Sequence, residues 1–452
     1  MKDTSTDGEA KMIPLHKCFL QAALICLLGA PAAQAARLGA FCTLTEANDL
    51  QGTNVERRLP IASVSKVVTA LWSLEKGGAD YRFKTTLQVT PVENDQVDLH
   101  IEGSRDPFFG RESLHFAISE LNRRGIKKVR TLSFDENFKF YVQVTSDHTA
   151  ASHYTTASPL PQTVLAQLKS MGSLTSGWSK TLQVAKATGT PLVEKARFSV
   201  EDIRFVPKSE AVSSSETVSF VMKSAPLLSL LKEMNRNSNN HAANQIFEHF
   251  GGAGHFRSFA AGSLGLGSRQ IDMLNGSGDR VDLDSGAAYN EASCGTILRI
   301  LRRLRSVLKS TGKDLQNVLA VAGGDNPSSV SKIYNNDVTQ KSLIAKTGTV
   351  NPAITLAGLI RTLDGDVYFM YNIETKGTSA DWRNARALIR QKITELIRDH
   401  NGGKPVKYSA LQFMSVDDQS IFEGETIETD DLNHYVTDIP TPSPRPPIES
   451  LP

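Results

Sequence analysis

The chain has 452 residues, enough for two or three domains with a large core. Its 50 basic and 48 acidic residues give a formal net charge of +2. This balance, with no basic patches interleaved with aromatic residues, argues against nucleic acid as a partner and favours a small polar or peptide-like substrate.

The N-terminal segment has the pattern of an export signal. Lys17 precedes a short apolar run at 19–28, and Ala33-Gln34-Ala35 supplies a small-x-small cleavage site. The apolar run is too short to span a membrane. We therefore predict a signal peptide at 1–35 and an exported, periplasmic protein, with an uncleaved anchor as the less favoured alternative.

Two of the four cysteines, Cys18 and Cys26, lie within the predicted signal peptide. The remaining pair, Cys42 and Cys294, would sit in an oxidising compartment, where a disulfide and two buried free thiols are both open interpretations. The sequence has no cysteine–histidine cluster and no H-E-x-x-H motif. We predict no metal site and no cofactor.

The first mature elements lead into a helix. Residues 37–46 predict a strand, and 47–58 predict a turn with a second short strand. After Pro60, an apolar helical period runs over 63–74 and stops at Lys76-Gly77-Gly78. Ser63 is expected to cap this helix.

Ser63 and Lys66 lie three residues apart, which places both side chains on one face of a helix. This S-x-x-K arrangement brings an amine within reach of the proton of a nucleophilic hydroxyl. The pattern recurs at Ser229/Lys232, Ser306/Lys309, Ser310/Lys313 and, as an identical Ser-Val-Ser-Lys, at 329–332. We interpret those four as surface serines with solvated lysines.

The middle of the chain has a different pattern of predicted elements. Residues 84–103 alternate as strands, 112–124 predict an amphipathic helix, and 128–215 predict short strands and loops without a catalytic signature. We predict a subdomain at 91–215 that is inserted into a discontinuous catalytic domain, which comprises 36–90 and 216–399.

Helical periodicity returns at 224–250 but is interrupted by the polar run 235–240, which contains Ser238-Asn239-Asn240. A loop at such an interruption would project side chains into a cleft. Further along, we predict glycine-rich turns at 263–278 and a helix at 295–309. Three strands are predicted at 342–350, 354–362 and 366–374, followed by a closing helix at 382–398. Short turns between the three strands indicate an antiparallel meander. The acidic, proline-rich segment 400–452 is predicted to be a disordered tail.

These motifs supply the parts that acyl transfer needs. Ser63 would be the nucleophile and Lys66 its base. A free lysine has a pKa of about 10.4, so Lys66 must be buried or lie beside a second cation, such as Lys346. The Ser238 hydroxyl can relay a proton toward a leaving amine, and the Asn240 amide can hold both Lys66 and a substrate carbonyl.

The Lys346-Thr347-Gly348-Thr349 segment would bind the substrate. Lys346 and the Thr347 hydroxyl suit a terminal carboxylate, and Gly348 would leave room for the substrate along the strand edge. The backbone N–H groups of Ser63 and Thr349 can converge on a developing oxyanion.

The order S-x-x-K, S-x-N, K-T-G resembles the serine DD-peptidase and β-lactamase superfamily. The chain is similar to the class C low-molecular-mass penicillin-binding proteins of the penicillin-binding protein 4 type in three further features. These are the long insert, the segment Ser224-Ala225-Pro226-Leu227 and the segment Asn275-Gly276-Ser277-Gly278. The resemblance implies an α+β fold, in which a transpeptidase-like antiparallel sheet is flanked by helices. It also implies D-Ala-D-Ala carboxypeptidase or DD-endopeptidase action on peptidoglycan stem peptides, with β-lactams as covalent inhibitors.

Two alternatives remain at this point. A secreted serine β-lactamase would need a deacylating glutamate or tyrosine, and no E-x-x-L-N motif is found. A catalytically silent peptidoglycan-binding protein is disfavoured by the three intact motifs. An esterase is disfavoured because the sequence contains no G-x-S-x-G. The preference between terminal and cross-link cleavage stays open, as does the oligomeric state.

Overall fold

The computed structural model describes residues 37–47, 49–138, 140–141, 153–154, 175 and 177–422. The predicted signal peptide and residues 423–452 lie outside this part of the chain. Within it, no helix has the length and apolar character needed to cross a membrane.

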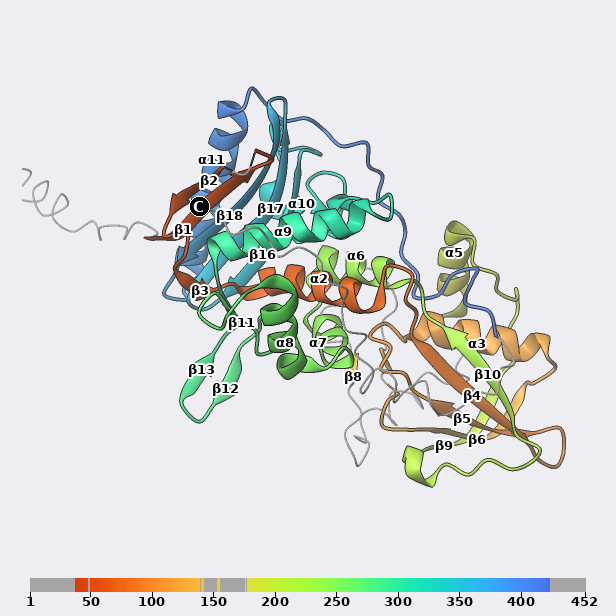
Figure 1. Cartoon of the computed structure of the whole chain (residues 1–452). Coiled ribbons are helices and arrows are strands. Elements are labelled where there is room, and N and C mark those ends of the chain that lie inside the picture. Colours follow the sequence, from red (N-terminus) through yellow and green to blue (C-terminus); the bar gives the residue numbers. More distant parts are fainter. Residues whose placement is uncertain are drawn as a thin grey trace, which may run out of the picture. The chain divides into compact units, whose positions relative to one another are not determined.

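A six-stranded antiparallel sheet (Figure 1) has the order β15-β16-β17-β18-β1-β2, and one of its faces contributes to the larger hydrophobic core. Its strands are β1 (Arg37–Thr45), β2 (Leu50–Thr53), β15 (Ala320–Val321), β16 (Leu343–Val350), β17 (Ala353–Thr362) and β18 (Gly365–Glu374). The predicted meander is therefore confirmed as β16-β17-β18. The strand at the start of the described chain, β1, pairs with β18 and extends the sheet.

Helices cover both faces of this sheet. The surrounding helices are α2 (Ser65–Gly77), α6 (Leu227–Asn237), α7 (Asn240–His249), α8 (Gly252–Leu264), α9 (Cys294–Lys309) and α11 (Ser379–Asp399). Leu359 of β17 and Met370 of β18 share one core with α9, whereas the alternate residues of each strand face the other way. On that opposite face α11 contacts β17 and β18 (Figure 1). The predicted α+β fold is confirmed.

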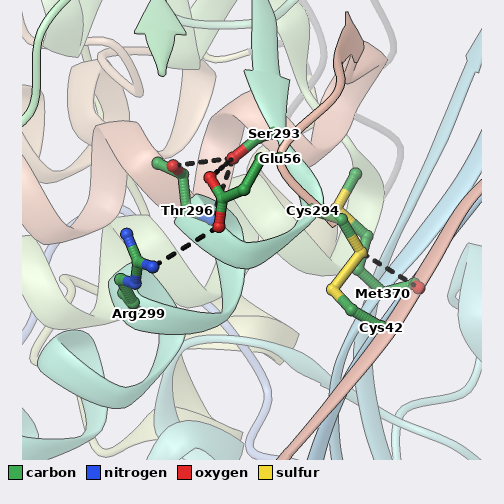
Figure 2. The surroundings of a disulfide bond; sticks show 7 residues. All are labelled: Cys42, Glu56, Ser293, Cys294, Thr296, Arg299 and Met370. Atoms are coloured by element: carbon green, nitrogen blue, oxygen red, sulfur yellow. Dashed lines mark hydrogen bonds and ion pairs between the residues drawn. A yellow bond between two sulfur atoms is a disulfide. The ribbon is translucent and has the colours of Figure 1, made fainter. Parts of the chain in front are cut away.

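A disulfide joins Cys42 of β1 to Cys294, the first residue of α9 (Figure 2). Of the two interpretations left open by the sequence, the structure contains the bonded one. Cys294 Sγ lies 3.6 Å from the carbonyl oxygen of Met370, on the strand beside β1. Ser293 caps the same helix by accepting a hydrogen bond from the Thr296 N–H at 3.3 Å. The start of α9 is thereby attached to the sheet.

A second hydrophobic core surrounds a five-stranded sheet in the order β10-β4-β5-β6-β9. It contains β4 (Lys84–Pro91), β5 (Val97–Glu102), α3 (Arg111–Arg123), β6 (Lys128–Phe134), α5 (Trp178–Thr188), β9 (Ser199–Phe205) and β10 (Val218–Lys223). The chain enters this sheet through β4 and leaves through β10, and these two strands pair antiparallel. This separate core supports the proposal of an inserted subdomain, completed by strands just outside the predicted limits of 91 and 215.

Several short elements connect these layers. They are β3 (Arg58–Pro60), η1 (Ala62–Val64), β7 (Phe140–Tyr141), β8 (His153–Tyr154), η3 (Lys208–Glu210), β11 (Ile271–Asp272), β12 (Val281–Leu283), β13 (Gly286–Ala288), β14 (Glu291–Ser293), η4 (Leu315–Asn317) and α10 (Ser329–Tyr334). The helices α5, α8 and α10 had not been predicted, and α5 lies in the stretch 128–215 for which only short strands and loops were expected. Gly251 is the N-cap of α8 and Gly252 is its first residue, so this glycine pair starts a new helix.

The segment 404–422 packs against the rest of the protein, so the prediction that disorder begins at residue 400 is wrong as far as Phe422. Met414, Val416 and Phe422 are buried in the second core. Asp417 accepts two hydrogen bonds from Arg82, both at 2.8 Å. The prediction of disorder rested on the acidic and polar composition of the tail, in which these few apolar residues did not stand out.

Candidate active site

Ser63 lies in the short 3-10 turn η1, immediately before α2. The residue at the N-cap of α2 is Val64, which makes no side-chain capping bond, so the expectation that Ser63 caps the helix is wrong. Ala62 has a φ of 49°, a left-handed conformation that is costly for a non-glycine residue. The carbonyl of Ile61 is held by the Thr355 hydroxyl at 3.0 Å. This constrained turn leaves the Ser63 hydroxyl available for chemistry.

Lys66 lies one turn after Ser63 and is completely buried. Its Nζ lies 3.0 Å from Ser63 Oγ, 2.7 Å from Asn240 Oδ1 and 3.0 Å from the carbonyl oxygen of Ser277. Burial lowers the pKa of Lys66 well below its usual value, and the positive charge of Lys346 lowers it further. The Lys66 amine is thus both buried and close to a second cation, which are the two conditions that we expected to let it act as a base.

The S-x-N motif forms the junction between α6 and α7. Ser238 ends α6 with a φ of 56°, and Asn239 caps α7 by accepting a hydrogen bond from the Ala242 N–H at 2.9 Å. Asn240 is the first residue of α7, and its amide reaches Lys66. The central Asn239 therefore has a capping function, which turns the residues on either side of it toward the cleft.

Lys346 lies on β16 and is buried. Its Nζ donates to Ser238 Oγ at 2.8 Å and to the Thr347 carbonyl at 2.8 Å. Burial lowers the pKa of Lys346 to about 7. An amine with this pKa can both give and accept a proton near neutral pH.

Gly348 lies where β16 passes closest to the start of the Ser63 turn. A Cβ at this position would lie 2.1 Å from Thr355 Oγ1 and 3.0 Å from the backbone nitrogen of Ser63. Packing between β16, β17 and η1 therefore requires the glycine. The sequence had suggested a different reason, space for substrate at the strand edge.

A cleft of about 280 Å³ between η1, the α6–α7 junction and β16 is lined by Ser63, Ser238, Asn240 and residues 347–349. Of the lining side chains that the sequence analysis did not identify, two make hydrogen bonds to the 346–349 segment. Ser329 of α10 lies 2.7 Å from Thr347 Oγ1, and Arg386 of α11 donates to Thr349 Oγ1 at 3.2 Å. The surface interpretation of Ser329 is wrong. No local signal distinguishes Arg386 from the other arginines of α11.

The remaining S-x-x-K pairs divide into two groups. Ser306, Lys309, Ser310 and Lys313 are exposed, as expected. Lys232 is different, because its Nζ lies 2.6 Å from Asp325 Oδ2 inside the protein. The solvated interpretation of Lys232 is therefore wrong.

Within the described residues, no group of three or more histidine, cysteine, aspartate or glutamate side chains could hold a metal ion. A serine hydroxyl beside a buried amine, together with a second lysine–serine pair, is an arrangement suited to acyl transfer by a serine enzyme.

Residues 20–199 and 200–395 match the D-Ala-D-Ala carboxypeptidase 3 (S13) family. The chain belongs to this family and is a serine-type peptidase, a hydrolase. A search of curated protein sequences finds no match.

Solved structures agree with this assignment. The Bd3459 predatory peptidoglycan endopeptidase of Bdellovibrio bacteriovorus is 34% identical, with a TM-score of 0.78 over 86% of this chain and 100% of that one. The Bd0816 predatory endopeptidase of the same organism, solved with the immunity protein Bd3460, is 35% identical, with a TM-score of 0.78 over 85% of this chain and 99% of that one. Penicillin binding protein 4 of Haemophilus influenzae shares the fold at 16% identity, with a TM-score of 0.51 over 78% of this chain and 96% of that one.

Proposed function

We propose that this protein cleaves D-alanyl amide bonds in peptidoglycan stem peptides through an acyl-enzyme on Ser63, and that β-lactams acylate the same residue. The observation that carries the proposal is the 3.0 Å approach of Lys66 Nζ to Ser63 Oγ in a buried site. The similar Bd3459 endopeptidase has been solved in a form acylated by penicillin G.

In this proposal Lys66 acts as the neutral amine. A neutral amine has two N–H bonds, which can be directed at Asn240 Oδ1 and the Ser277 carbonyl, and a lone pair that is left to accept the Ser63 proton. Ser63 Oγ then attacks the substrate carbonyl carbon. Backbone N–H groups of Ser63 and Thr349 stabilise the oxyanion.

Lys346 and Ser238 complete the acylation step. As the C–N bond breaks, the leaving amine takes the Ser238 proton, and the Lys346 ammonium replaces it across the 2.8 Å hydrogen bond. Deacylation is the reverse process with water in place of the amine. The attacking water returns a proton to Lys346 through Ser238, and Lys66 returns its proton to Ser63.

The free edge of β16 would hold the substrate backbone. The neighbouring strand β15 pairs only with Ile344 and Ala345, so in the described part of the chain no strand covers β16 beyond them on that side. Hydroxyls of Thr347 and Thr349, together with the Arg386 guanidinium, then suit a carboxylate next to the scissile amide. Such a carboxylate is present in both terminal and cross-linked D-alanyl substrates.

The segment before residue 36 supports export to the periplasm as part of the same proposal. Peptidoglycan lies outside the cytoplasmic membrane, and the predicted signal peptide would direct the enzyme there. The Cys42–Cys294 disulfide is consistent with an oxidising compartment.

Intact-mass measurement after exposure to penicillin tests the proposal. We expect one adduct on the wild type and on Ser306→Ala, a control at an exposed S-x-x-K serine. We expect none on Ser63→Ala or Lys66→Ala. An equal adduct on Ser63→Ala would remove Ser63 from its role, and rapid turnover of penicillin by the wild type would favour a β-lactamase instead.

A further inference from the structure

The Asp279 carboxylate contacts Asn240, one of the residues that hold Lys66. The Asn240 side chain accepts from Lys66 Nζ through Oδ1 at 2.7 Å and donates through Nδ2 to Asp279 Oδ2 at 3.1 Å. An ionised carboxylate can only accept hydrogen bonds. The Asn240 NH₂ group must therefore face Asp279, and its carbonyl oxygen must face Lys66.

The Asp279 side chain and backbone are both held in place. Its Oδ1 accepts from the Arg280 N–H at 3.0 Å, and its own N–H donates to Ser277 Oγ at 3.1 Å. The Asn275 side chain donates to the Asp279 carbonyl at 3.0 Å. Although the residue is exposed, its carboxylate is thus fixed in direction.

Two glycines hold this loop against the catalytic helices. A Cβ at Gly276 would lie 2.1 Å from the Ala243 carbonyl of α7, and one at Gly278 would lie 1.9 Å from the Ala62 carbonyl beside the nucleophile. Because glycine has no side chain at either position, the loop can approach α7 and the Ser63 turn closely. This approach places the Ser277 carbonyl against Lys66 and Asp279 against Asn240.

We propose that Asp279 is a positioning residue for acyl transfer, which fixes the Asn240 amide so that its oxygen, and never its NH₂ group, faces the Lys66 amine. The inference rests on the proposed function. It concerns a residue outside the three sequence motifs, contributed by the loop before β12.

The consequence of losing this constraint follows from hydrogen-bond chemistry. A flipped Asn240 would present N–H donors to the Lys66 nitrogen. Those donors would compete with the Ser63 hydroxyl for the single lone pair of the neutral amine. Removing Asp279 should therefore slow acylation without removing any group that touches the substrate.

The charge of Asp279 has a second, opposite effect. Burial and the positive charge of Lys346 lower the pKa of Lys66, whereas the negative charge of Asp279 raises it. These are the charged groups that face Lys66, from β16 and from the loop before β12. Neutralising Asp279 should lower the pKa of Lys66, so the variant would keep a deprotonated base at lower pH and still react more slowly.

The test is the penicillin acylation rate of the full chain as a function of pH, for wild type, Asp279→Asn, Asp279→Glu and Asp282→Asn. Asp282 is the matched control, since it is an exposed carboxylate three residues away that pairs with Arg280. For Asp279→Asn we expect the plateau rate to fall about tenfold, because small misplacements of catalytic groups are costly. We also expect the acid limb of its profile to move to lower pH. Asp279→Glu should keep the limb near the wild-type position, and Asp282→Asn should match the wild type.

The outcomes separate this inference from the proposed function. If the wild type forms no adduct, the proposed function fails, whatever Asp279 does. If the wild type is acylated and Asp279→Asn matches it in plateau and limb, the positioning role is wrong. If Asp279→Asn lowered both the plateau rate and the Tm while the acid limb stayed in place, the role of Asp279 would be purely structural, and the inference would also be overturned.

Discussion

Lys66 and Lys346 are both buried, next to side chains that line one cleft. Each amine lies against a serine hydroxyl, Lys66 against Ser63 and Lys346 against Ser238. Withdrawal from water disfavours the ammonium form of both residues, and the positive charge of Lys346 further disfavours that of Lys66. Near neutral pH, one of the two is therefore able to carry the proton while the other is free.

The first prediction concerns this coupling. Lys346→Gln removes the positive charge that helps to lower the pKa of Lys66, so the pKa of Lys66 should rise. Because acylation needs the neutral amine, the acid limb of the penicillin acylation profile should move to higher pH, and the plateau should fall about 10²-fold from loss of the proton donor.

Stopped-flow measurement over pH checks this prediction, with Lys332→Gln as the control at an exposed lysine of the second Ser-Val-Ser-Lys. The direction is opposite to that expected for Asp279→Asn. A limb that moves to lower pH in Lys346→Gln would contradict the assigned electrostatics.

At the scale of elements, the cleft is built from pieces that meet only after folding. The terminal helix α11 contributes Arg386, which contacts Thr349 of β16, and the short helix α10 contributes Ser329, which contacts Thr347 of the same strand. Helix α11 carries none of the three motifs, and α10 carries only the second copy of Ser-Val-Ser-Lys. Substrate preference therefore depends on how these helices pack on the sheet as well as on the motif residues.

Arg386→Gln tests the contribution of α11. A guanidinium–carboxylate interaction contributes about 1.5–3 kcal/mol, so cleavage of D-alanyl peptides with a free carboxylate should fall roughly 10- to 100-fold in kcat/KM. The corresponding C-terminal amide should lose little, because it carries no charge for Arg386 to pair with.

The measurement is the ratio of acid to amide cleavage for wild type, Arg386→Gln and Arg383→Gln. Arg383 lies on the same helix but is exposed and absent from the residues that line the cleft. Equal losses on both substrates would assign Arg386 to folding of the cleft instead of to carboxylate binding.

The segment 404–422 is a second element whose contribution can be measured. Burial alone would raise the pKa of Asp417, but the hydrogen bonds and charge of Arg82 together hold it below its usual value. Asp417→Asn should therefore lower the free energy of unfolding by about 1–2 kcal/mol near neutral pH.

The sign of the pH dependence follows from linkage. The folded state binds the Asp417 proton less readily than the unfolded chain does, so this stabilisation is present above the unfolded pKa of about 3.9 and is lost as pH falls through the lower folded value. Urea denaturation near pH 7 and below pH 4 should show the difference shrinking at acid pH. Asp418→Asn, an exposed neighbour, should show none.

For the whole molecule, the Cys42–Cys294 disulfide closes a loop with a sequence separation of 252 residues. In the chain-entropy account such a long loop restricts the unfolded chain by about 5 kcal/mol, with measured losses usually nearer 2–5 kcal/mol. The bond joins the first strand of the sheet to the helix on its face, so its loss should destabilise the larger core.

We expect the double variant Cys42→Ala/Cys294→Ala to have a lower Tm than the oxidised wild type and to be insensitive to reductant. Calorimetry with and without dithiothreitol checks this, with the reduced wild type expected to resemble the variant. An unchanged Tm in both would show that the bond makes no net contribution to stability.

The sequence by itself predicted the chemistry of the site and most of the regular elements around it. A hydroxyl one helical turn before an amine, a polar break between two apolar helices, and an alternating strand pattern are local features, because each depends on neighbours within a few residues. They were enough to predict Ser63, Lys66, Ser238, Asn240 and the 346–349 strand as one site, and the β16-β17-β18 meander.

Only the tertiary structure decided what each of the two identical Ser-Val-Ser-Lys tetrapeptides contributes to the cleft, and which further residues lie beside them. Ser63 and Ser329 begin the same tetrapeptide, yet one lies beside a buried lysine and the other beside Thr347. Asp279 and Arg386 carry no local signal, since charged residues are common and the partners of these two lie far along the chain. The pairing of Cys42 with Cys294 was likewise left open, because the distance between them is a property of the packed chain.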